Sequence, residues 1–198
     1  MSQYTIPNVV DRSGGSEKIV DVYSHLLGNR IVYLGVPIDD GVANTIIAQL
    51  LHLDSSSRDL PISMYINSPG GSLTAMTAIF DAMHHIGAPV ATTCVGQAAA
   101  DAAVLLAAGE PGQRAMLAHA RAVLRQPHAD GARGTIPDLI VAADEIVRQR
   151  REVEEMLAGS TGRTPEQIHR DFDRDHGAST TFKSKADLWN SGSSPAST

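Results

Sequence analysis

The hydrophobic residues of this chain follow two recurring patterns, which are short unbroken apolar runs and stripes with helical spacing. Short runs rich in β-branched residues predict buried strands, and apolar residues repeating every three or four positions predict helices that bury one face. The predicted strands are residues 30–35, 62–66, 90–95, 115–117 and 122–124. The predicted helices are about residues 40–52, 72–85, 98–108 and 137–157, followed by a short helix that a capping box starts at Thr164.

Strand and helix alternate at intervals of roughly 25–30 residues, which is typical of βαβ units and a largely parallel sheet. We therefore expect an α/β fold with one main domain at residues 17–190. Residues 1–16 contain a proline and a pair of glycines and are expected to form a flexible segment. Residues 191–198 are a low-complexity tail that we expect to be disordered.

Composition narrows the class of protein without identifying it. The 198 residues are 42% hydrophobic and 19% charged, as in an ordinary globular protein. The net charge of −6 disfavours nucleic acid as a partner, because such domains usually present a basic face. Cys94 is the single cysteine, so no disulfide can form within the chain. Residues 1–11 lack the features of a signal peptide. No run reaches the ~18 apolar residues of a membrane span. We expect a cytoplasmic protein with no membrane segment.

Candidate chemistry lies at two strand-to-helix turns. In the first, the pair Gly70-Gly71 lets the backbone approach another chain or an anion closely, although a tight turn alone explains the same motif. The second turn runs from Cys94 to Asp101 and joins a strand to a helix N-terminus, where backbone amides can stabilise an oxyanion. Two such turns in one sheet can converge on one pocket.

Histidines and acidic residues show no metal-binding pattern. His84 and His85 are adjacent on a predicted helix and point about 100° apart. The acidic run that begins at Asp171 imitates the start of an EF-hand loop, but Phe182 stands where such a loop needs glutamate. We therefore predict no metal and no cofactor.

Several motifs in order carry a family resemblance. They are Arg30-Ile-Val-Tyr-Leu-Gly35, Tyr65-Ile-Asn-Ser-Pro-Gly-Gly71, Gly96-Gln-Ala-Ala99, Leu105-Leu-Ala-Ala-Gly109, Gln126-Pro127 and Asp173-Arg-Asp175. Over about residues 17–178 the chain resembles ClpP, the proteolytic subunit of the ATP-dependent Clp protease. The resemblance implies a ClpP/crotonase-like fold with a protruding strand-helix handle at about residues 126–157. It also implies a serine-type endopeptidase with a Ser-His-Asp triad inside two stacked heptameric rings, served by a Clp ATPase unfoldase.

The chain departs from the family at the triad. Ala100 stands at the position of the nucleophilic serine and Arg125 at that of the histidine base. Asp175 matches the triad acid, and the two backbone amides of the oxyanion hole fall on Gly71 and Asp101. Alanine has no atom that attacks a carbonyl, and arginine stays protonated at neutral pH, so it accepts no proton. We therefore expect the chain to be inactive on its own.

Three functions remain open on these residues. The first is a structural or regulatory subunit that forms heptameric rings, alone or with an active ClpP paralogue. The second is an active hydrolase with another nucleophile, such as Asp101 or Ser72. The third is a binding module that captures a peptide or acyl group on the retained oxyanion amides.

Two structural expectations follow from the resemblance and the pattern. Arg125 and Asp175 should form an ion pair, with Asp101 as a second candidate partner, because the matching family positions are adjacent. The apolar face of the helix predicted at residues 40–52 carries Val42, Ile46 and Leu50. We expect this face to exceed what one protomer buries and so to contact a neighbouring subunit.

Overall fold

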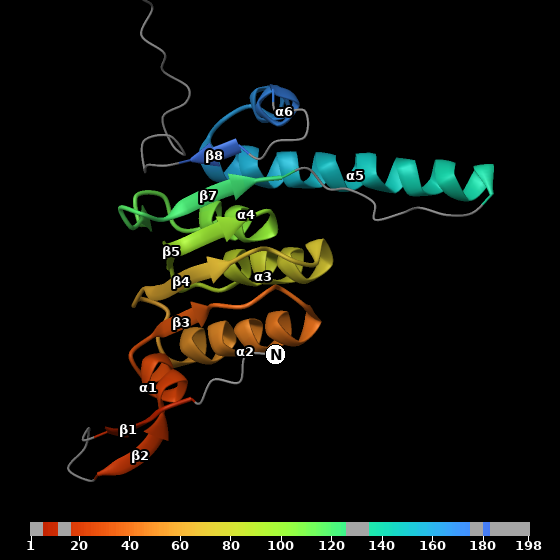
Figure 1. The fold of residues 1–198 in the computed structure, drawn as a ribbon. Helices are drawn as coiled ribbons and strands as arrows, with labels where there is room; N and C mark the ends of the chain where they lie inside the picture. Colours follow the sequence, from red (N-terminus) through yellow and green to blue (C-terminus); the bar gives the residue numbers. More distant parts are fainter. Residues whose placement is uncertain (1–5, 12–16, 126–134, 175–179, 183–198) are drawn as a thin grey trace, which may run out of the picture.

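The computed structural model describes residues 6–11, 17–125, 135–174 and 180–182, in which strands and helices alternate (Figure 1). The strands are β1 (Asn8–Asp11), β2 (Lys18–Asp21), β3 (Ile31–Leu34), β4 (Ile62–Ser68), β5 (Val90–Ala99), β6 (Arg114–Met116), β7 (Arg121–Leu124) and β8 (Thr180–Phe182). The helices are α1 (Val22–Gly28), α2 (Asp40–Ser56), α3 (Leu73–His85), α4 (Asp101–Ala107), α5 (Ile136–Thr161) and α6 (Pro165–Arg174).

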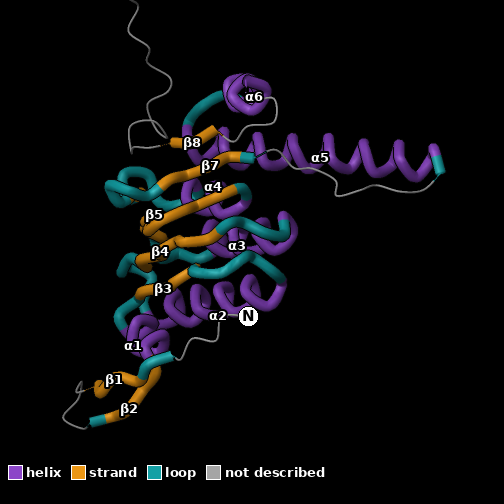
Figure 2. The backbone as a smooth tube through the Cα atoms, in the orientation of Figure 1, coloured by secondary structure: helices purple, strands orange, loops and turns teal. Residues whose placement is uncertain are grey.

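The main sheet has the order β3-β4-β5-β7-β8, and β6 pairs with β5 beside β7. All of its pairings are parallel except that of β8, which runs antiparallel to β7. Helices α2, α3 and α4 connect successive strands and stack on the same side of the sheet (Figures 1 and 2). The expected α/β fold of repeated βαβ units is confirmed.

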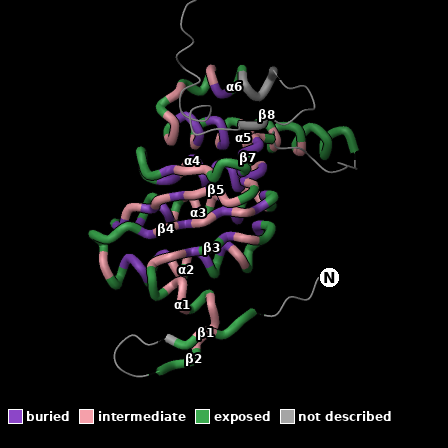
Figure 3. Tube along the Cα trace, turned by 60° about the vertical axis from the view of Figure 1, so that its left-hand side comes forward, coloured by how far each residue is buried: buried purple, intermediate pink, exposed green. Residues whose placement is uncertain are grey.

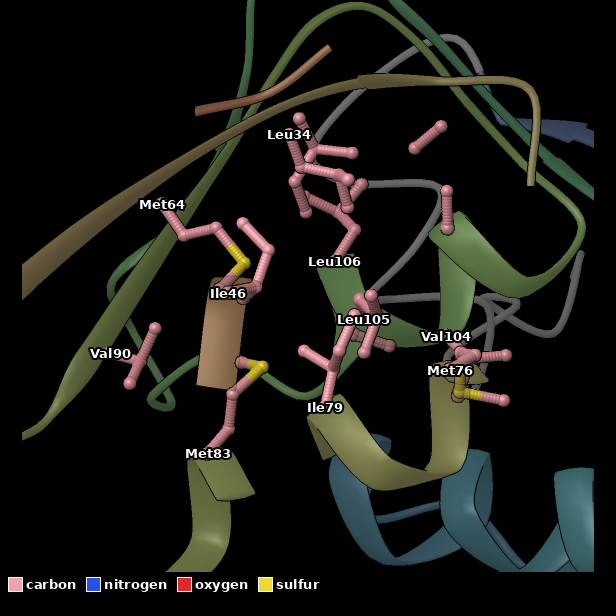
Figure 4. Packing of buried hydrophobic residues seen from close by; sticks show 14 of the residues in the cluster. Leu34, Ile46, Met64, Met76, Ile79, Met83, Val90, Val104, Leu105 and Leu106 are labelled. Carbon is pink, nitrogen blue, oxygen red and sulfur yellow. The ribbon is translucent and has the colours of Figure 1, made fainter. Parts of the chain in front are cut away.

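The core lies between this sheet and its helices. Along β4 buried and half-buried residues alternate, which places Ile62, Met64 and Ile66 on the helix side. Met76 and Ile79 of α3 and the leucines of α4 belong to the same buried cluster (Figure 4). Figure 3 shows buried segments along both the strands and the helices. The apolar strand pattern therefore builds one continuous core.

The opposite face of the sheet is only partly covered. Ser63, Tyr65 and Thr93 are half-buried there, and Tyr33 is 38% exposed. Parallel sheets are normally covered on both faces, because their strands are apolar on both sides. This face is therefore a surface where a second layer would bury further area.

The apolar face of α2 packs largely into the protomer's own core, so Ile46 and Leu50 are not the surplus apolar surface that was expected for contact with a neighbouring subunit. Ile46 is 4% exposed and Leu50 is fully buried, while Val42 packs against the same cluster. Several exposed apolar residues lie on α5, whose N-terminal half projects away from the sheet (Figure 1). They are Ile136, Leu139, Ile140, Val141 and Val147.

Helix ends follow their local sequence signals. Gln167 N donates to Thr164 Oγ1 at 3.3 Å and Thr164 N donates to Gln167 Oε1 at 3.0 Å, which confirms the predicted capping box of α6. Helix α5 starts one residue before the predicted position and continues to Thr161, where Gly162 caps it with φ of 70°. Among the described residues, no helix combines the length and the apolar character that a bilayer crossing requires.

The N-terminal region holds structure that the apolar pattern did not indicate. The antiparallel hairpin of β1 and β2 lies partly within residues 1–16, which were expected to be flexible throughout. Its register pairs Val9 with Val20. The predicted tail at residues 191–198 and the start of the predicted handle, residues 126–134, lie outside the described residues.

Candidate functional site

The candidate nucleophile position is a strained turn between β5 and α4. Ala100 has φ of 49° and ψ of −119°, and its amide donates to Val123 O of β7 at 2.8 Å. A non-glycine residue with positive φ costs on the order of 1–3 kcal/mol and persists only where its surroundings impose it. This strand-to-helix geometry is the one that exposes a nucleophilic serine in hydrolases. Here it presents a methyl group.

The helix after this turn begins later than its composition suggests. Residues 98–108 were expected to be helical, but Ala98 and Ala99 continue β5 and pair with Ala122 and Val123 of β7. Alanine favours helix intrinsically, and here the pairing with β7 overrides that preference. As a result Ala100 lies at the end of the strand rather than inside the helix.

The Gly70-Gly71 turn packs directly against the Ala100 turn. Gly70 has φ of 92°, and a Cβ added there would lie 2.6 Å from Ala99 O. A Cβ on Gly71 would collide with the backbone of Ile38, which pairs with this turn. Both glycines are therefore required by packing alone, whether or not the turn has a chemical role.

The two turns are joined by a hydrogen bond that uses one candidate oxyanion donor. Gly71 N donates to Asp101 Oδ2 at 3.1 Å. Asp101 is the first residue of α4 and is half-buried. The structure therefore brings Gly71, Ala100 and Asp101 together, and it directs the amide of Gly71 at a carboxylate of the chain itself.

Asn67, a residue of the Tyr65–Gly71 motif that was given no role of its own, accepts a backbone hydrogen bond in the same region. Asn67 Oδ1 accepts from Gln97 N at 3.3 Å, and Gly96 beside it has φ of 118°. A Cβ on Gly96 would lie 2.8 Å from that oxygen. The signal in the sequence was a polar residue directly before the Ser-Pro-Gly-Gly turn, where an asparagine side chain can bond the backbone.

The remaining triad positions are only partly placed. Arg125 follows β7 directly and is exposed. Since Val123 pairs with Ala99, the chain leads Arg125 past the Ala100 turn. Asp175 lies outside the described residues, so its predicted pair with Arg125 stays a prediction.

Other nucleophiles near these turns have structural roles. Ser72 caps α3, and its Oγ accepts from Ala75 N at 3.3 Å. Burial raises the pKa of the Cys94 thiol to about 11, and the thiol donates a hydrogen bond to Arg121 O at 3.6 Å. The thiol is therefore protonated near neutral pH and is a poor nucleophile.

A cavity lies at another place in the protomer, between α1, β3 and α2. Its volume is about 750 Å³, and its lining includes Tyr23, Tyr33, Val36, Val42 and Gln49. The rings of Tyr23 and Tyr33 are 6.3 Å apart at its edge. Within the described ranges, no group of three or more His, Cys, Asp or Glu is arranged to hold a metal ion.

Comparison with known proteins gives consistent matches. Residues 14–183 match the family model of the Clp protease. The chain is 64% identical to ATP-dependent Clp protease proteolytic subunit 1 of Nocardia farcinica, over 88% of this chain and 89% of the relative. It is 55% identical to proteolytic subunit 4 of Rhodococcus jostii, over 88% and 90% of the two chains. It is 53% identical to proteolytic subunit 2 of Streptomyces avermitilis, over 88% of each.

Proposed function

Because this chain belongs to the Clp protease family, we propose that it is a ring subunit without serine-peptidase activity of its own. In this proposal it serves as a structural or regulatory partner of an active ClpP paralogue. The observation that carries it is the Ala100 turn, which keeps the strained geometry of a nucleophile while presenting only a methyl group. Arg125, at the position of the base, adds a second loss.

The chemistry of these two positions supports inactivity. Peptide hydrolysis by this family's mechanism needs a hydroxyl and a base that removes its proton. Ala100 supplies no hydroxyl, and the guanidinium of Arg125 offers only hydrogen-bond donors and accepts no proton. Changing either residue alone therefore leaves the other defect in place.

The active-hydrolase alternative is less well supported. Its candidate nucleophiles were Ser72 and Asp101, and both side chains already accept backbone hydrogen bonds, from Ala75 and Gly71. The binding-module alternative relied on free oxyanion amides. The bond from Gly71 to Asp101 occupies one of these amides, which argues against that alternative as well.

Three surfaces of the protomer support assembly into rings. They are the partly covered sheet face around Tyr65, the exposed apolar residues along α5, and the open cavity beside Tyr33. Burying apolar surface stabilises association by about 25 cal/mol per Å² before the costs of binding. We propose heptameric rings of the family type, with α5 as the handle and a Clp ATPase as unfoldase. We place them in the cytoplasm, where such an ATPase finds ATP.

Native mass spectrometry tests the assembly. The chain is measured alone and after co-expression with an intact ClpP subunit from the same source. A mixed particle of ring size supports the proposal, and monomers under both conditions contradict it. A fluorogenic peptide assay on the chain alone tests inactivity, since turnover comparable to that of the intact subunit would refute it.

A further inference from the structure

The amide of Gly71 is a donor whose partner in a working peptidase would be the developing oxyanion. In this chain its partner is Asp101 Oδ2, at 3.1 Å. A hydrogen bond with a charged acceptor is stronger than one between neutral groups. The carboxylate therefore occupies the position that an oxyanion or a carboxylate ligand would need.

Packing holds the two groups in this arrangement. A Cβ on Gly70 would lie 3.2 Å from Asp101 N, so the glycine turn is pressed against the first residue of α4. The backbone of Ile38 holds the other side of the turn, because Ile38 N donates to Gly70 O at 3.0 Å and Ser72 N donates to Ile38 O at 2.8 Å. The bond to Asp101 thus joins two segments that are each fixed by other contacts.

We propose that Asp101 is a built-in occupant of the Gly71 amide, which closes this site to anionic groups such as tetrahedral oxyanions and peptide C-terminal carboxylates. Asp101 is then a third residue that disables the site, beside Ala100 and Arg125. Asp101 acts in two ways. It accepts the hydrogen bond of the Gly71 amide, and it places a negative charge beside the position where the oxyanion would develop. The kinetic consequence rests on the proposed function, whereas the contact itself does not.

The first experiment measures peptide hydrolysis in a background that restores nucleophile and base. The variants are A100S/R125H, the same pair with Asp101→Ala, and the same pair with Asp40→Ala. Asp40 is the control, because it is an aspartate at the first position of α2, as Asp101 is at that of α4, but it is exposed where Asp101 is half-buried. Removing one oxyanion donor from a hydrolase costs about 10²–10³-fold in kcat. Releasing Gly71 should therefore raise kcat/KM by about 10²-fold.

The triple variant with Asp40→Ala controls for a general effect of removing an aspartate from the start of a helix. The Asp40→Ala triple variant should match A100S/R125H. The proposal is overturned if Asp101→Ala raises kcat/KM by no more than about twofold over the pair, or if Asp40→Ala raises it equally. Where Asp101→Ala unfolds the chain, Asp101→Asn removes the charge at constant size and should give a smaller increase.

The second experiment needs no activity. Hydrogen exchange of the Gly71 amide is compared in the unaltered chain, in Asp101→Ala and in Asp40→Ala. Loss of the acceptor should accelerate exchange at Gly71 by at least about tenfold in Asp101→Ala only. Unchanged exchange would overturn the proposed contact. Peptide turnover by the unaltered chain would instead refute the proposed function, and exchange would still decide the role of Asp101.

Discussion

Two turns of this molecule hold a non-glycine residue in the left-handed region, and they differ in how that strain is compensated. Arg30, with φ of 61°, joins α1 to β3, and Ala100, with φ of 49°, joins β5 to α4. They are the only non-glycine residues of the described chain with positive φ. Similar backbone strain is therefore present at two sites with different side chains.

The strain at Arg30 has a structural explanation. Its guanidinium donates to Leu53 O and Ser57 O, both at 3.0 Å, and so bonds carbonyls at the C-terminal end of α2. It also donates to Leu60 O at 2.8 Å and Pro61 O at 3.2 Å in the segment leading to β4. These bonds offset the cost of the backbone conformation.

The strain at Ala100 has no such compensation from its side chain, because a methyl group makes no hydrogen bond. The turn is imposed by β5, β7 and the adjacent Gly70. Backbone strain that is not offset by hydrogen bonds of the residue's own side chain is a feature of functional sites. The comparison therefore supports the proposal that the Ala100 turn keeps the geometry of a catalytic site without its chemistry.

The largest effect is expected from returning chemistry to the Ala100 turn. Ala100→Ser alone should leave peptide hydrolysis near background, because Arg125 cannot accept the serine proton. In serine proteases, loss of one triad member costs roughly 10⁶-fold in kcat, or on the order of 8 kcal/mol of barrier. A100S/R125H should give detectable activity, still below that of an active family member because Asp101 engages Gly71.

A fluorogenic peptide assay measures this on the unaltered chain, both single variants and the pair. R125H alone is the control for added base without nucleophile. If the serine variant were as active as an active ClpP, Arg125 would not be what prevents catalysis at the Ala100 turn.

The second-largest effect is expected from removing the side-chain hydrogen bonds that offset the backbone strain at Arg30. Arg30→Ala should lower the free energy of unfolding by about 3 kcal/mol, since hydrogen bonds to charged groups contribute about 1.5–3 kcal/mol and their loss leaves carbonyls without a donor. Chemical denaturation measures it. Arg30→Lys keeps the charge but not the planar set of donors and should cost about half as much. No loss in Arg30→Ala would remove the explanation of its strain.

A smaller change of opposite sign is expected at Ala100. Ala100→Gly relieves strain of about 1–3 kcal/mol and adds about 0.5–1 kcal/mol of chain entropy cost. The chain should therefore become more stable by about 1 kcal/mol in the same denaturation assay. Ala99→Gly is the matched control, because Ala99 is extended in β5 and the change should destabilise the chain. Destabilisation by both would contradict the strain at Ala100.

The smallest effect is a loss of stability at acidic pH, and it concerns Asp54 in α2, the helix whose C-terminal end Arg30 contacts. Burial raises the pKa of Asp54 in α2, but the amides of Ala88 and Gly87 and the guanidinium of Arg58 outweigh it, so the pKa lies below its ordinary value. A lowered pKa means that this carboxylate stabilises the fold above its ordinary pKa of about 3.9, and that the contribution disappears as the pH falls further.

Denaturation midpoints measured from about pH 6 to pH 3 test this, with ordinary carboxyl titration as the reference. Asp54→Asn should flatten the acid side of the curve, whereas Asp40→Asn, an exposed change in the same helix, should not. Equal curves for all three proteins would contradict the role of Asp54.

The apolar pattern predicted most of the fold. The central strands were located because each is a short β-branched run, and the capping box at Thr164 located α6. The hairpin of β1 and β2 was missed, since Val10 and Ile19 are exposed and each strand is only 4 residues long. The start of α4 was misplaced because strand pairing overrides the helix propensity of alanine.

The sequence by itself determined the family, the fold class and the absence of a serine and a histidine from positions 100 and 125, because these depend on residue identity and on order along the chain. Only the tertiary structure decided that Ile46 and Leu50 of α2 are internal and that Gly71 donates to Asp101. That hydrogen bond joins residues 30 positions apart. Its existence depends on how two turns pack and on where one side chain points, and neither is written in a local pattern.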